Sequence, residues 1–289
     1  MRLAFLGTPE AAVPSLEALV AAGHDVVLVI SQPDRRRGRG STVTPSPVKA
    51  AALAWGLPVA DQLAALDDVD VERAIVVAYG ELIPATTLAR TPMLNVHFSL
   101  LPRWRGAAPV ERAILAGDEE TGVGIISLEA ALDTGPLHAE GRTTIGDKTA
   151  SELTKELAQL GAHLLVEVLA SPDLLRHPWP QQGESTYAAK LTPETFHITP
   201  EMTVDEARRV VQLERAFIKV EGRRLRILRA ATGEVDVAPG VVTASAESVH
   251  VGLRDGSLVV HWVQPEGSRT MSGVAWWAGA RLDGDAAWD

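Results

Sequence analysis

The sequence predicts an α/β protein: a doubly wound, Rossmann-like, mostly parallel sheet followed by a small C-terminal β-barrel of the OB-like kind. Through residue 170, short apolar runs alternate with helical patterns, as in a parallel sheet covered by helices. After residue 203, short strands separated by glycines dominate, as in a small barrel. The expected division of the 289 residues is a first domain at 1–185, a linker at 186–203 and a barrel domain at 204–289.

Each element of the first domain is inferred from the spacing of its apolar residues. An apolar run bounded by turn-forming residues predicts a strand, and apolar residues every three or four positions predict a helix. The clearest helical pattern covers residues 150–170, where leucine or valine recurs along one face. In chain order, the predicted elements are strand 2–7, helix 9–23, strand 25–31, helix 48–55, strand 58–60, strand 74–79, strand 94–99, helix 110–116, strand 122–128, edge strand 137–145 and helix 150–170.

Two segments interrupt this alternation. Residues 32–47 are polar and rich in arginine, glycine and proline, and they are long for a connection between a strand and a helix. A loop of this kind is either functional or disordered. Residues 171–203 contain five prolines with little periodicity, so we expect them to be irregular and to lead into the second domain.

The second domain is expected to begin with a short helix at 203–213. Thr203 is a good N-cap, and Glu206 stands three residues later, which together predict a capping box. Glycines then separate short apolar stretches that alternate as strands do. The predicted strands are 217–220, 225–229, 240–244, 248–253 and 257–263.

Composition narrows the class of protein. Hydrophobic residues make up 46% and charged residues 22% of the chain, which is ordinary for a soluble globular protein. The chain has no cysteine, so disulfides, cysteine nucleophiles and cysteine-bound zinc are excluded. No apolar run approaches the roughly 18 residues of a membrane span, and the N-terminus does not resemble a signal peptide. We therefore expect a cytoplasmic protein that does not associate with membranes.

The net charge is −10, yet basic residues gather in two places. Residues 208–229 hold eight Lys and Arg against two Glu, and residues 35–39 hold four Arg and no acid. Such islands on an acidic protein can bind a polyanion, although they can also be ordinary solvated surface. The candidate contacts with nucleic acid are Arg35, Arg36, Arg37, Arg39, Arg208, Arg209, Arg223 and Arg224.

Three polar residues form the candidate catalytic site. Asn95 and His97 stand two residues apart near the end of the predicted strand 94–99, so their side chains point to the same face. Asp133 follows later in the chain, in a Leu-Asp-Thr-Gly-Pro turn. An amide, an imidazole and a carboxylate form a set suited to acyl transfer. The alternative is that the histidine is structural and the aspartate only forms the turn.

The remaining motifs are less specific. Arg103, Trp104 and Arg105 are either a basic-aromatic contact with nucleic acid or a loop that packs its own side chains. Residues 6–10 follow a strand but lack the G-x-G-x-x-G spacing, so a nicotinamide or flavin dinucleotide is not expected. The other histidines lack metal-ligand spacing, and we expect no metal.

Motifs over most of the chain resemble the formyltransferase family that uses 10-formyltetrahydrofolate. The Asn-x-His pair at 95–97 with a later Asp is shared by the folate-dependent formyltransferases. The Arg-Trp-Arg-Gly-Ala-Ala-Pro run at 103–109, the Gly-Arg-Gly loop at 38–40 and the second domain resemble the members that act on initiator methionyl-tRNA. The other matching segments are 5–10, 32–35, 45–49, 77–84, 116–123, 132–135, 187–190 and 264–267 with Met271.

Three features depart from the family pattern. Arg36 stands where the loop commonly has proline, which adds a charge and frees φ. Residues 215–220 lack the Asn-Pro element that usually follows an Arg-Ala pair, and the segment before residue 74 is short. These departures concern the contacts with tRNA rather than the chemistry.

The resemblance implies a formyl transfer from 10-formyltetrahydrofolate to charged initiator methionyl-tRNA, for translation initiation, by a monomer without a metal. Asn95 and His97 would stabilise the oxyanion, and Asp133 would manage the proton. The folate site would involve Ser99, Leu100, Leu101, Pro102, Glu81, Leu82 and Ile83. Two alternatives remain: an N-formyltransferase for nucleotide amino-sugars, and a module that binds tRNA or folate without turnover.

Overall fold

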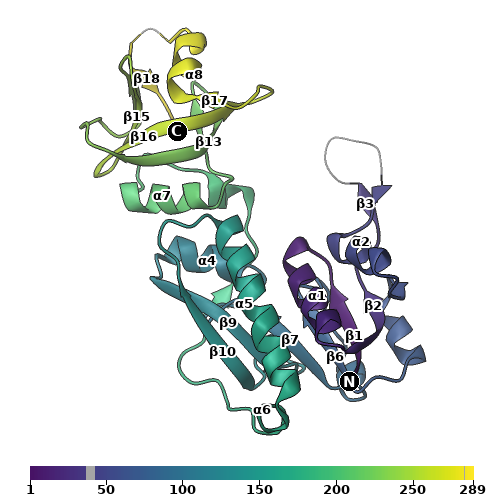
Figure 1. Ribbon diagram of the computed structural model, residues 1–289. Coiled ribbons are helices and arrows are strands. Elements are labelled where there is room, and N and C mark those ends of the chain that lie inside the picture. Colours follow the sequence, from purple (N-terminus) through teal and green to yellow (C-terminus); the bar gives the residue numbers. More distant parts are fainter. Residues whose placement is uncertain (37–42, 283) are drawn as a thin grey trace. The chain divides into compact units, whose positions relative to one another are not determined.

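The structure is a computed structural model that describes residues 1–36, 43–282 and 284–289 (Figure 1). These residues form two compact units, each built from more than one stretch of the chain. The first unit comprises residues 1–110, 120–144 and 153–189, and the second comprises residues 111–119, 145–152 and 190–289. The second unit therefore takes two short stretches from the half of the chain that otherwise forms the first.

A seven-stranded, mostly parallel sheet forms the centre of the first unit, which confirms the predicted fold class of this half. The strand order is β10-β9-β7-β6-β1-β2-β5, and all neighbours from β7 to β5 are parallel. The middle strands are almost wholly buried, as their apolar runs predicted. In chain order the strands are β1 (Arg2–Gly7), β2 (Asp25–Ile30), β5 (Val59–Ala60), β6 (Arg73–Val77), β7 (Met93–His97), β9 (Glu120–Ser127) and β10 (Leu137–Thr144).

Strands β9 and β10 depart from the parallel pattern. β9 pairs antiparallel with β7, and β10 pairs antiparallel with β9 at the edge of the sheet. The predicted edge position of the second strand is confirmed. Residues 128–136 join the two strands, and this loop is shorter than the dozen or more residues that a parallel crossover needs. This turn contains Asp133, so the antiparallel pair helps to bring the carboxylate to its place.

Helices cover the sheet at the positions that the apolar spacing predicted. They include α1 (Val13–Ala21), α2 (Pro47–Ala54) and α5 (Ala150–Ala170), whereas most of α4 (Pro109–Ala116) belongs to the second unit. Helix α5 lies close against the sheet, because a Cβ at Gly161 would come within 2.6 Å of the Val96 side chain. None of the helices in the described part of the chain is long and apolar enough to cross a membrane.

Short elements lie in the segments that were predicted to be irregular. Between β2 and α2, β3 (Arg35–Arg36) pairs with β4 (Val43–Thr44). After α5, the chain forms α6 (Pro172–Arg176), β11 (Tyr187–Ala188) and the 3₁₀ turn η3 (Pro193–Phe196). Strand β11 pairs in parallel with β8 (Arg105–Gly106), so it ties this late segment to the loop after β7. A further 3₁₀ turn, η2 (Leu63–Asp68), and a short helix, α3 (Ala85–Leu88), complete the first unit.

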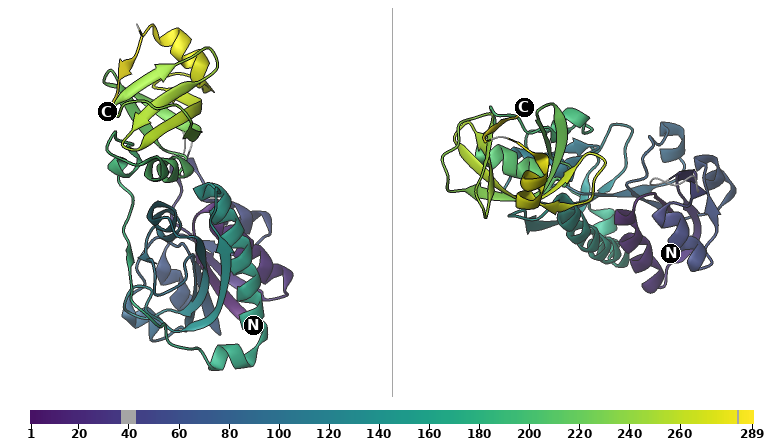
Figure 2. Two further views of the ribbon diagram at one scale, coloured as in Figure 1. Left: turned by 90° about the vertical axis from the view of Figure 1, so that its left-hand side faces the viewer. Right: turned by 90° about the horizontal axis from the view of Figure 1, so that it is seen from above.

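The second unit begins with the predicted helix and closes into the predicted barrel. Helix α7 (Val204–Gln212) starts at Thr203, whose hydroxyl accepts from the Glu206 amide while the Glu206 carboxylate accepts from the Thr203 amide, so the capping box is confirmed. The strands follow the order β12-β13-β16-β15-β14-β18 and curve round (Figure 2). Lys219 and Asp289 exchange main-chain hydrogen bonds at 2.6 and 2.8 Å, which nearly closes the barrel. The strands are β12 (Phe217–Val220), β13 (Arg223–Gly233), β14 (Val241–Ala244), β15 (Val249–Leu253), β16 (Gly256–Pro265) and β18 (Ala286–Ala287).

One helix of the barrel was not predicted. Strand β17 (Met271–Ser272) pairs with β16, and α8 (Gly273–Ala280) follows it at once. The sequence Gly-Val-Ala-Trp-Trp-Ala-Gly-Ala has no polar face to reveal a helical period, and its two glycines lower helix propensity. The N-cap is Ser272, whose hydroxyl accepts from the Ala275 amide at 3.2 Å.

The stretches 111–119 and 145–152 pack within the second unit. Asp147 pairs with Arg208 of α7 at 2.7 Å, and the Gln212 side chain donates to the carbonyls of Gly146 and Lys148. Leu115 of α4 packs against the core of the barrel unit. The second unit therefore depends on residues from earlier in the chain: Asp147 precedes its partner Arg208 by 61 positions, and Gly146 precedes Gln212 by 66.

Candidate active site

The candidate site lies at the carboxyl end of β7, where the loop to α4 begins. Asn95 and His97 lie on this buried strand, and their side chains are 9% and 6% exposed. Asn95 pairs with Val76 of β6 on one side and with Ile126 of β9 on the other, so its position is fixed by the centre of the sheet. Asp133, in the turn between β9 and β10, is 7% exposed.

The structure brings the three predicted catalytic residues together. The Asn95 amide donates to Oδ1 of Asp133 at 3.5 Å, a long hydrogen bond. Nδ1 of His97 lies 3.7 Å from Oδ2 of Asp133. The same Oδ2 accepts from the main-chain amide of Gly106 at 2.9 Å, which is the shortest polar contact of the carboxylate. The carboxylate therefore lies between an amide, an imidazole and a main-chain donor.

A main-chain carbonyl determines which nitrogen of the neutral His97 ring carries the proton. Nε2 of His97 lies 2.9 Å from the carbonyl oxygen of Trp104. A carbonyl only accepts hydrogen bonds, so Nε2 carries a proton and, in the neutral ring, Nδ1 holds the free electron pair. Trp104 has a φ of 63°, which is uncommon for a bulky residue. Ser99 helps to hold this loop, because its hydroxyl donates to the Arg103 carbonyl at 2.7 Å.

The turn that carries Asp133 has an unusual backbone. Its φ is 52°, in the left-handed region that aspartate tolerates better than most residues. Gly135 has to be glycine, since a Cβ there would lie 1.8 Å from the Ser127 carbonyl oxygen. The Gln181 side chain also contacts this turn: its Nε2 lies 2.8 Å from the Asp133 carbonyl and 2.9 Å from that of Gly135.

Sequence reasoning missed two of these contributors. Gln181 stands in a proline-rich segment without periodicity, and Gly106 contributes only its main-chain amide. No local pattern marks either one. The sequence placed Arg105 in a basic-aromatic run without assigning it a partner. In the structure its guanidinium donates two hydrogen bonds to Oε1 of Gln181, from Nε at 3.0 Å and from Nη2 at 2.6 Å.

The predicted folate positions fall into a buried and an exposed group. Ser99, Leu101 and Pro102 are buried, and Leu101 packs against Ile126 and Leu137. Leu100 and Ile83 are half-buried, and Glu81 is exposed. Leu82 is 83% exposed, which is unusual for a leucine and leaves an apolar surface after β6. Both groups follow strand ends at one edge of the sheet, where open α/β sheets bind ligands.

Tyr79 borders the exposed group. Its hydroxyl lies 3.4 Å from the Glu81 carboxylate. Burial raises the pKa of Tyr79 to about 12, and the charge and hydrogen bond of Glu81 act in the same direction. The phenol is therefore neutral at physiological pH and can serve only as a hydrogen-bonding group.

The structure separates the predicted basic contacts. Arg208 pairs with Asp147 and Asp205, and Nη1 of Arg209 lies against Gly117, so both are used within the second unit. Arg223 and Arg224 are exposed at the start of β13. Arg35 reaches the Gln32 side chain at 3.4 Å. Arg36 lies in β3, while Arg37 and Arg39 lie outside the described residues.

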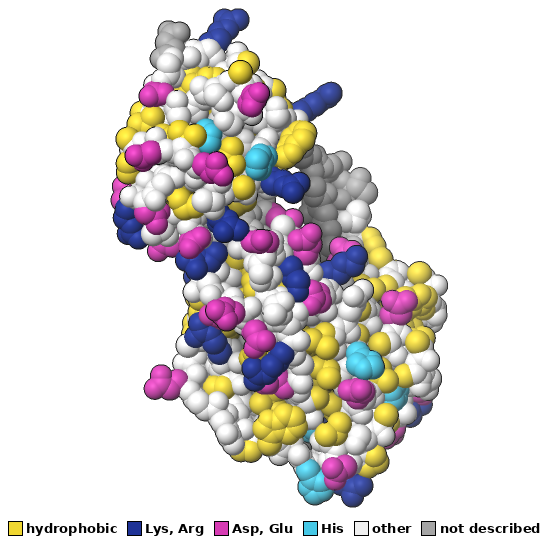
Figure 3. Space-filling view, turned by 60° about the vertical axis from the view of Figure 1, so that its left-hand side comes forward, with side chains coloured by type: hydrophobic (Ala, Val, Ile, Leu, Met, Phe, Trp, Pro, Cys, Tyr) yellow, Lys and Arg dark blue, Asp and Glu magenta, His cyan; other side chains and the backbone are white. Residues whose placement is uncertain are grey.

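The charged surface is mixed. On the face shown in Figure 3, Lys and Arg side chains lie among Asp and Glu rather than in one continuous patch. Arg224 lies over the Phe217 ring at 3.8 Å, and the Arg223 side chain makes no ion pair with any residue that the structure describes. Arg223 is therefore the more available of the two cations.

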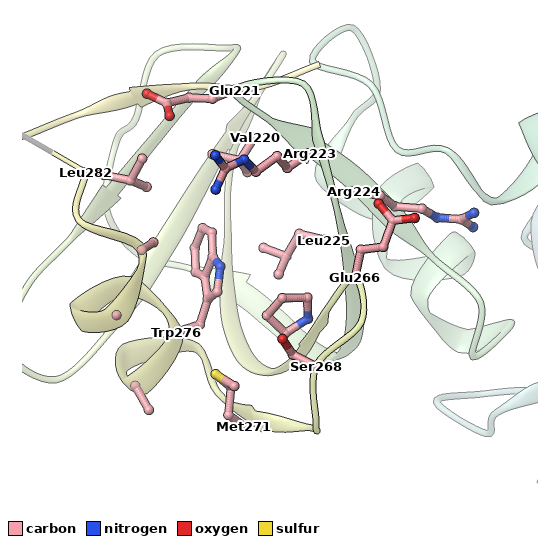
Figure 4. Close-up of a pocket in the computed structure, with 14 residues that line it drawn as sticks. Val220, Glu221, Arg223, Arg224, Leu225, Glu266, Ser268, Met271, Trp276 and Leu282 are labelled. Carbon is pink, nitrogen blue, oxygen red and sulfur yellow. The ribbon is translucent and has the colours of Figure 1, made fainter.

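A pocket of about 520 Å³ lies in the second unit beside these arginines. The β12–β13 turn, the end of β16 and α8 border it, and Arg223, Leu225, Met271 and Trp276 are among its lining residues. In Figure 4, Arg223 extends toward Trp276, whereas Arg224 points away on the other side of the strand. The pocket joins the indole surface of Trp276 to the Arg223 guanidinium.

The described residues contain no group of three His, Cys, Asp or Glu side chains that could hold a metal ion. His138, the buried histidine nearest in sequence to Asp133, has both ring nitrogens engaged, with Ser127 and with the Leu174 carbonyl.

Over most of its length, the chain matches a known class of enzymes. Residues 1–169 match the family model described as formyl transferase, and residues 190–281 match the one described as formyl transferase, C-terminal domain. The chain belongs to the formyl transferase family. A curated relative from Novosphingobium aromaticivorans, 44% identical over 98% of both chains, is named methionyl-tRNA formyltransferase.

Solved structures share the fold at lower identity. An N-formyltransferase from Helicobacter canadensis, in complex with folinic acid and dTDP-3-aminofucose, aligns with a TM-score of 0.70 at 17% identity and covers 91% of this chain and 98% of that one. A methionyl-tRNA formyltransferase from Clostridium thermocellum aligns with a TM-score of 0.58 at 14% identity, covering 94% and 100%. These likenesses support the Rossmann-like sheet followed by a barrel.

Proposed function

We propose that this protein transfers the formyl group of 10-formyltetrahydrofolate to the α-amino group of methionine on charged initiator methionyl-tRNA. The observation that carries this proposal is the contact of Asn95, His97 and Asp133 in one buried site. It is supported by the 44% identity, over nearly the whole chain, with a relative named for this reaction. Family membership supports a folate as the formyl donor.

The acceptor has to lose a proton. A free α-amino group has a pKa of about 7.7–8.0, so much of it is charged near pH 7 and cannot attack. In the neutral ring, Nδ1 of His97 holds the electron pair that can take this proton. The resulting imidazolium would face the Asp133 carboxylate, which stabilises it in a buried setting.

The bond changes then balance without another reactant. The amine nitrogen attacks the formyl carbon, a C–N bond forms, and negative charge develops on the formyl oxygen. The Asn95 amide, joined by the protonated His97, would donate to this oxygen, and one such donor is worth roughly 3 kcal/mol. The intermediate collapses as the bond from carbon to N10 breaks, His97 returns its proton to N10, and the surplus proton on the new amide nitrogen leaves to water.

The folate and the tRNA would use different surfaces. Exposed Leu82 offers an apolar surface to the flat rings of a folate, and Glu81 beside it can accept from their amino groups. The buried Ser99, Leu101 and Pro102, with Leu100 and Ile83, would shape the base of that site. Arg35, Arg223 and Arg224 would contact phosphates, and Arg36, Arg37 and Arg39 remain candidates for the acceptor stem.

The test compares three acceptors in the presence of 10-formyltetrahydrofolate: charged initiator methionyl-tRNA, the same tRNA uncharged, and a nucleotide amino-sugar. We expect formyl-methionine only from the charged tRNA. Transfer to the sugar alone would keep the site and overturn the acceptor. Tight retardation of tRNA without any product would favour the module that binds without turnover. Sedimentation during the assay would test the proposed monomer, and cell fractionation the proposed cytoplasmic location.

A further inference from the structure

We infer that Gln181 is a positioning residue for formyl transfer: it holds the main chain at Asp133 so that the carboxylate stays against His97. This inference rests on the proposed function of Asn95, His97 and Asp133. The Gln181 side chain forms no hydrogen bond with the side chains of these three residues. Its hydrogen bond to Asp133 goes to the main-chain carbonyl.

The neighbours of Gln181 fix the orientation of its amide. Nε2 donates to the carbonyls of Asp133 and Gly135, and Oε1 accepts twice from Arg105. Carbonyls only accept and a guanidinium only donates, so the reversed amide would place like groups together. Both donors and the acceptor of this one side chain are used.

These bonds close a ring around the Asp133 turn. Arg105 is followed by Gly106, whose main-chain amide donates to the Asp133 carboxylate at 2.9 Å. Gln181 joins the Arg105 guanidinium to the Asp133 carbonyl, so the main chain of Asp133 is bonded to the side chain of Gln181 and its carboxylate to the residue after Arg105. The Arg105 main chain is itself held, since its amide donates to the Thr186 carbonyl at 2.9 Å.

The turn needs such support. Asp133 has a positive φ, and a non-glycine residue in this region carries a cost of about 1–2 kcal/mol. Without Gln181, two buried carbonyls would lose their donor, and the turn could relax toward the common backbone region. Rotation there would move the carboxylate away from Nδ1 of His97, to which it is already 3.7 Å distant.

The test compares Gln181→Met with Gln182→Met in the full-length protein. Methionine keeps the length of the side chain and removes its hydrogen bonds. Gln182 is exposed, adjacent in sequence and without a hydrogen bond to any described residue, which makes it a matched control. We expect kcat to fall by about 10- to 100-fold in Gln181→Met, with each KM within about threefold, because a small displacement of a catalytic group has effects of this size. Gln182→Met should match the unmodified protein.

A double substitution separates positioning from general destabilisation. If Gln181 acts through the Asp133 carboxylate, adding Gln181→Met to Asp133→Asn should reduce kcat by less than about threefold. A further loss as large as that of the single substitution would overturn the inference, as would an unchanged kcat in Gln181→Met. Both results would leave the proposed function intact if the unmodified protein formylates methionyl-tRNA. Lack of formylation by the unmodified protein would instead overturn the proposed function, and with it this inference.

Discussion

His97 donates from Nε2 to the carbonyl oxygen of Trp104 at 2.9 Å, and this contact leaves Nδ1 as the basic nitrogen of the neutral ring. Nδ1 is also the nitrogen that faces Asp133. The strained backbone of Trp104 is thus connected to the chemistry through one hydrogen bond. A ring turned over, with Nδ1 toward the carbonyl, would direct its base away from the carboxylate.

Asp133→Asn tests the role of the carboxylate. The amide has nearly the same shape but cannot stabilise an imidazolium, so we expect kcat to fall by about a hundredfold or more, with little change in KM. Single-turnover formylation of charged tRNA is the measurement. Asp173→Asn, on exposed α6, is the control and should retain full activity. A variant at position 133 with normal turnover would contradict the proton-handling role.

Arg223→Ser tests the contact with nucleic acid. The Arg223 side chain is exposed and free of ion pairs among the described residues, so its loss should weaken tRNA binding and make the affinity less dependent on salt, by about one phosphate contact. The matched control is Arg254→Ser, because Arg254 is exposed in the same unit but lies 3.8 Å from the Glu206 carboxylate. The dependence of Kd on salt should distinguish the two variants. If Kd depends on salt equally in the two variants, Arg223 does not contact the nucleic acid.

The lowered pKa of His138 predicts how the stability of the fold depends on pH. Burial lowers its pKa below the usual value, and the nearby Arg73 charge acts in the same direction, against the hydrogen bond to Leu174. The unfolded chain then binds more protons than the folded protein below about pH 6.5, so stability is complete above that pH and falls as the pH drops. Urea unfolding between pH 7.5 and 5 should show this fall.

The variant His138→Asn should reduce that fall, because it keeps a donor for the Leu174 carbonyl without a titrating group. His24 and His250 also have lowered pKa values through burial, so part of the dependence should remain. If His138→Asn loses stability with pH as steeply as the unmodified protein, His138 does not contribute.

Alanine substitutions at Gly161 and Gly279 are expected to have opposite effects on the stability of the protein. A Cβ at Gly161 would lie 2.6 Å from Val96, so Gly161→Ala should destabilise the protein by about 1–3 kcal/mol and push α5 from β7. At Gly279, near the end of α8, a Cβ would meet no atom within 4 Å. Gly279→Ala should therefore stabilise by about 0.5–1 kcal/mol through helix propensity. Thermal melting of both variants is the measurement, and a shared sign would contradict the packing argument.

The sequence was most informative where function depends on local spacing. The two-residue interval between Asn95 and His97 already placed both side chains on one face of a strand, and the structure has that arrangement. The capping box of Thr203 and Glu206 could likewise be predicted, since all its hydrogen bonds lie within four consecutive residues. The class of each half of the fold followed from similar periodicities.

Other features depend on contacts that no local pattern contains. Gln181 is 48 residues from Asp133, in a segment that was predicted to be irregular. Helix α8 is apolar on every side, so a search for amphipathic spacing finds nothing there. β9 pairs antiparallel with both β7 and β10, and an apolar run does not encode strand direction.

The mixed composition of the second unit limits how this chain can be recombined. A fusion made at residue 190 would leave Asp147 without Arg208 and the carbonyl of Gly146 without Gln212. Leu115 would lose the apolar core on which it packs. A barrel taken from another protein would therefore have to suit a surface inherited with the catalytic half. If such halves were exchanged between related proteins during evolution, these residues would determine which barrels fit. Substitutions at positions 115, 146 and 147 should therefore be accompanied by substitutions in α7.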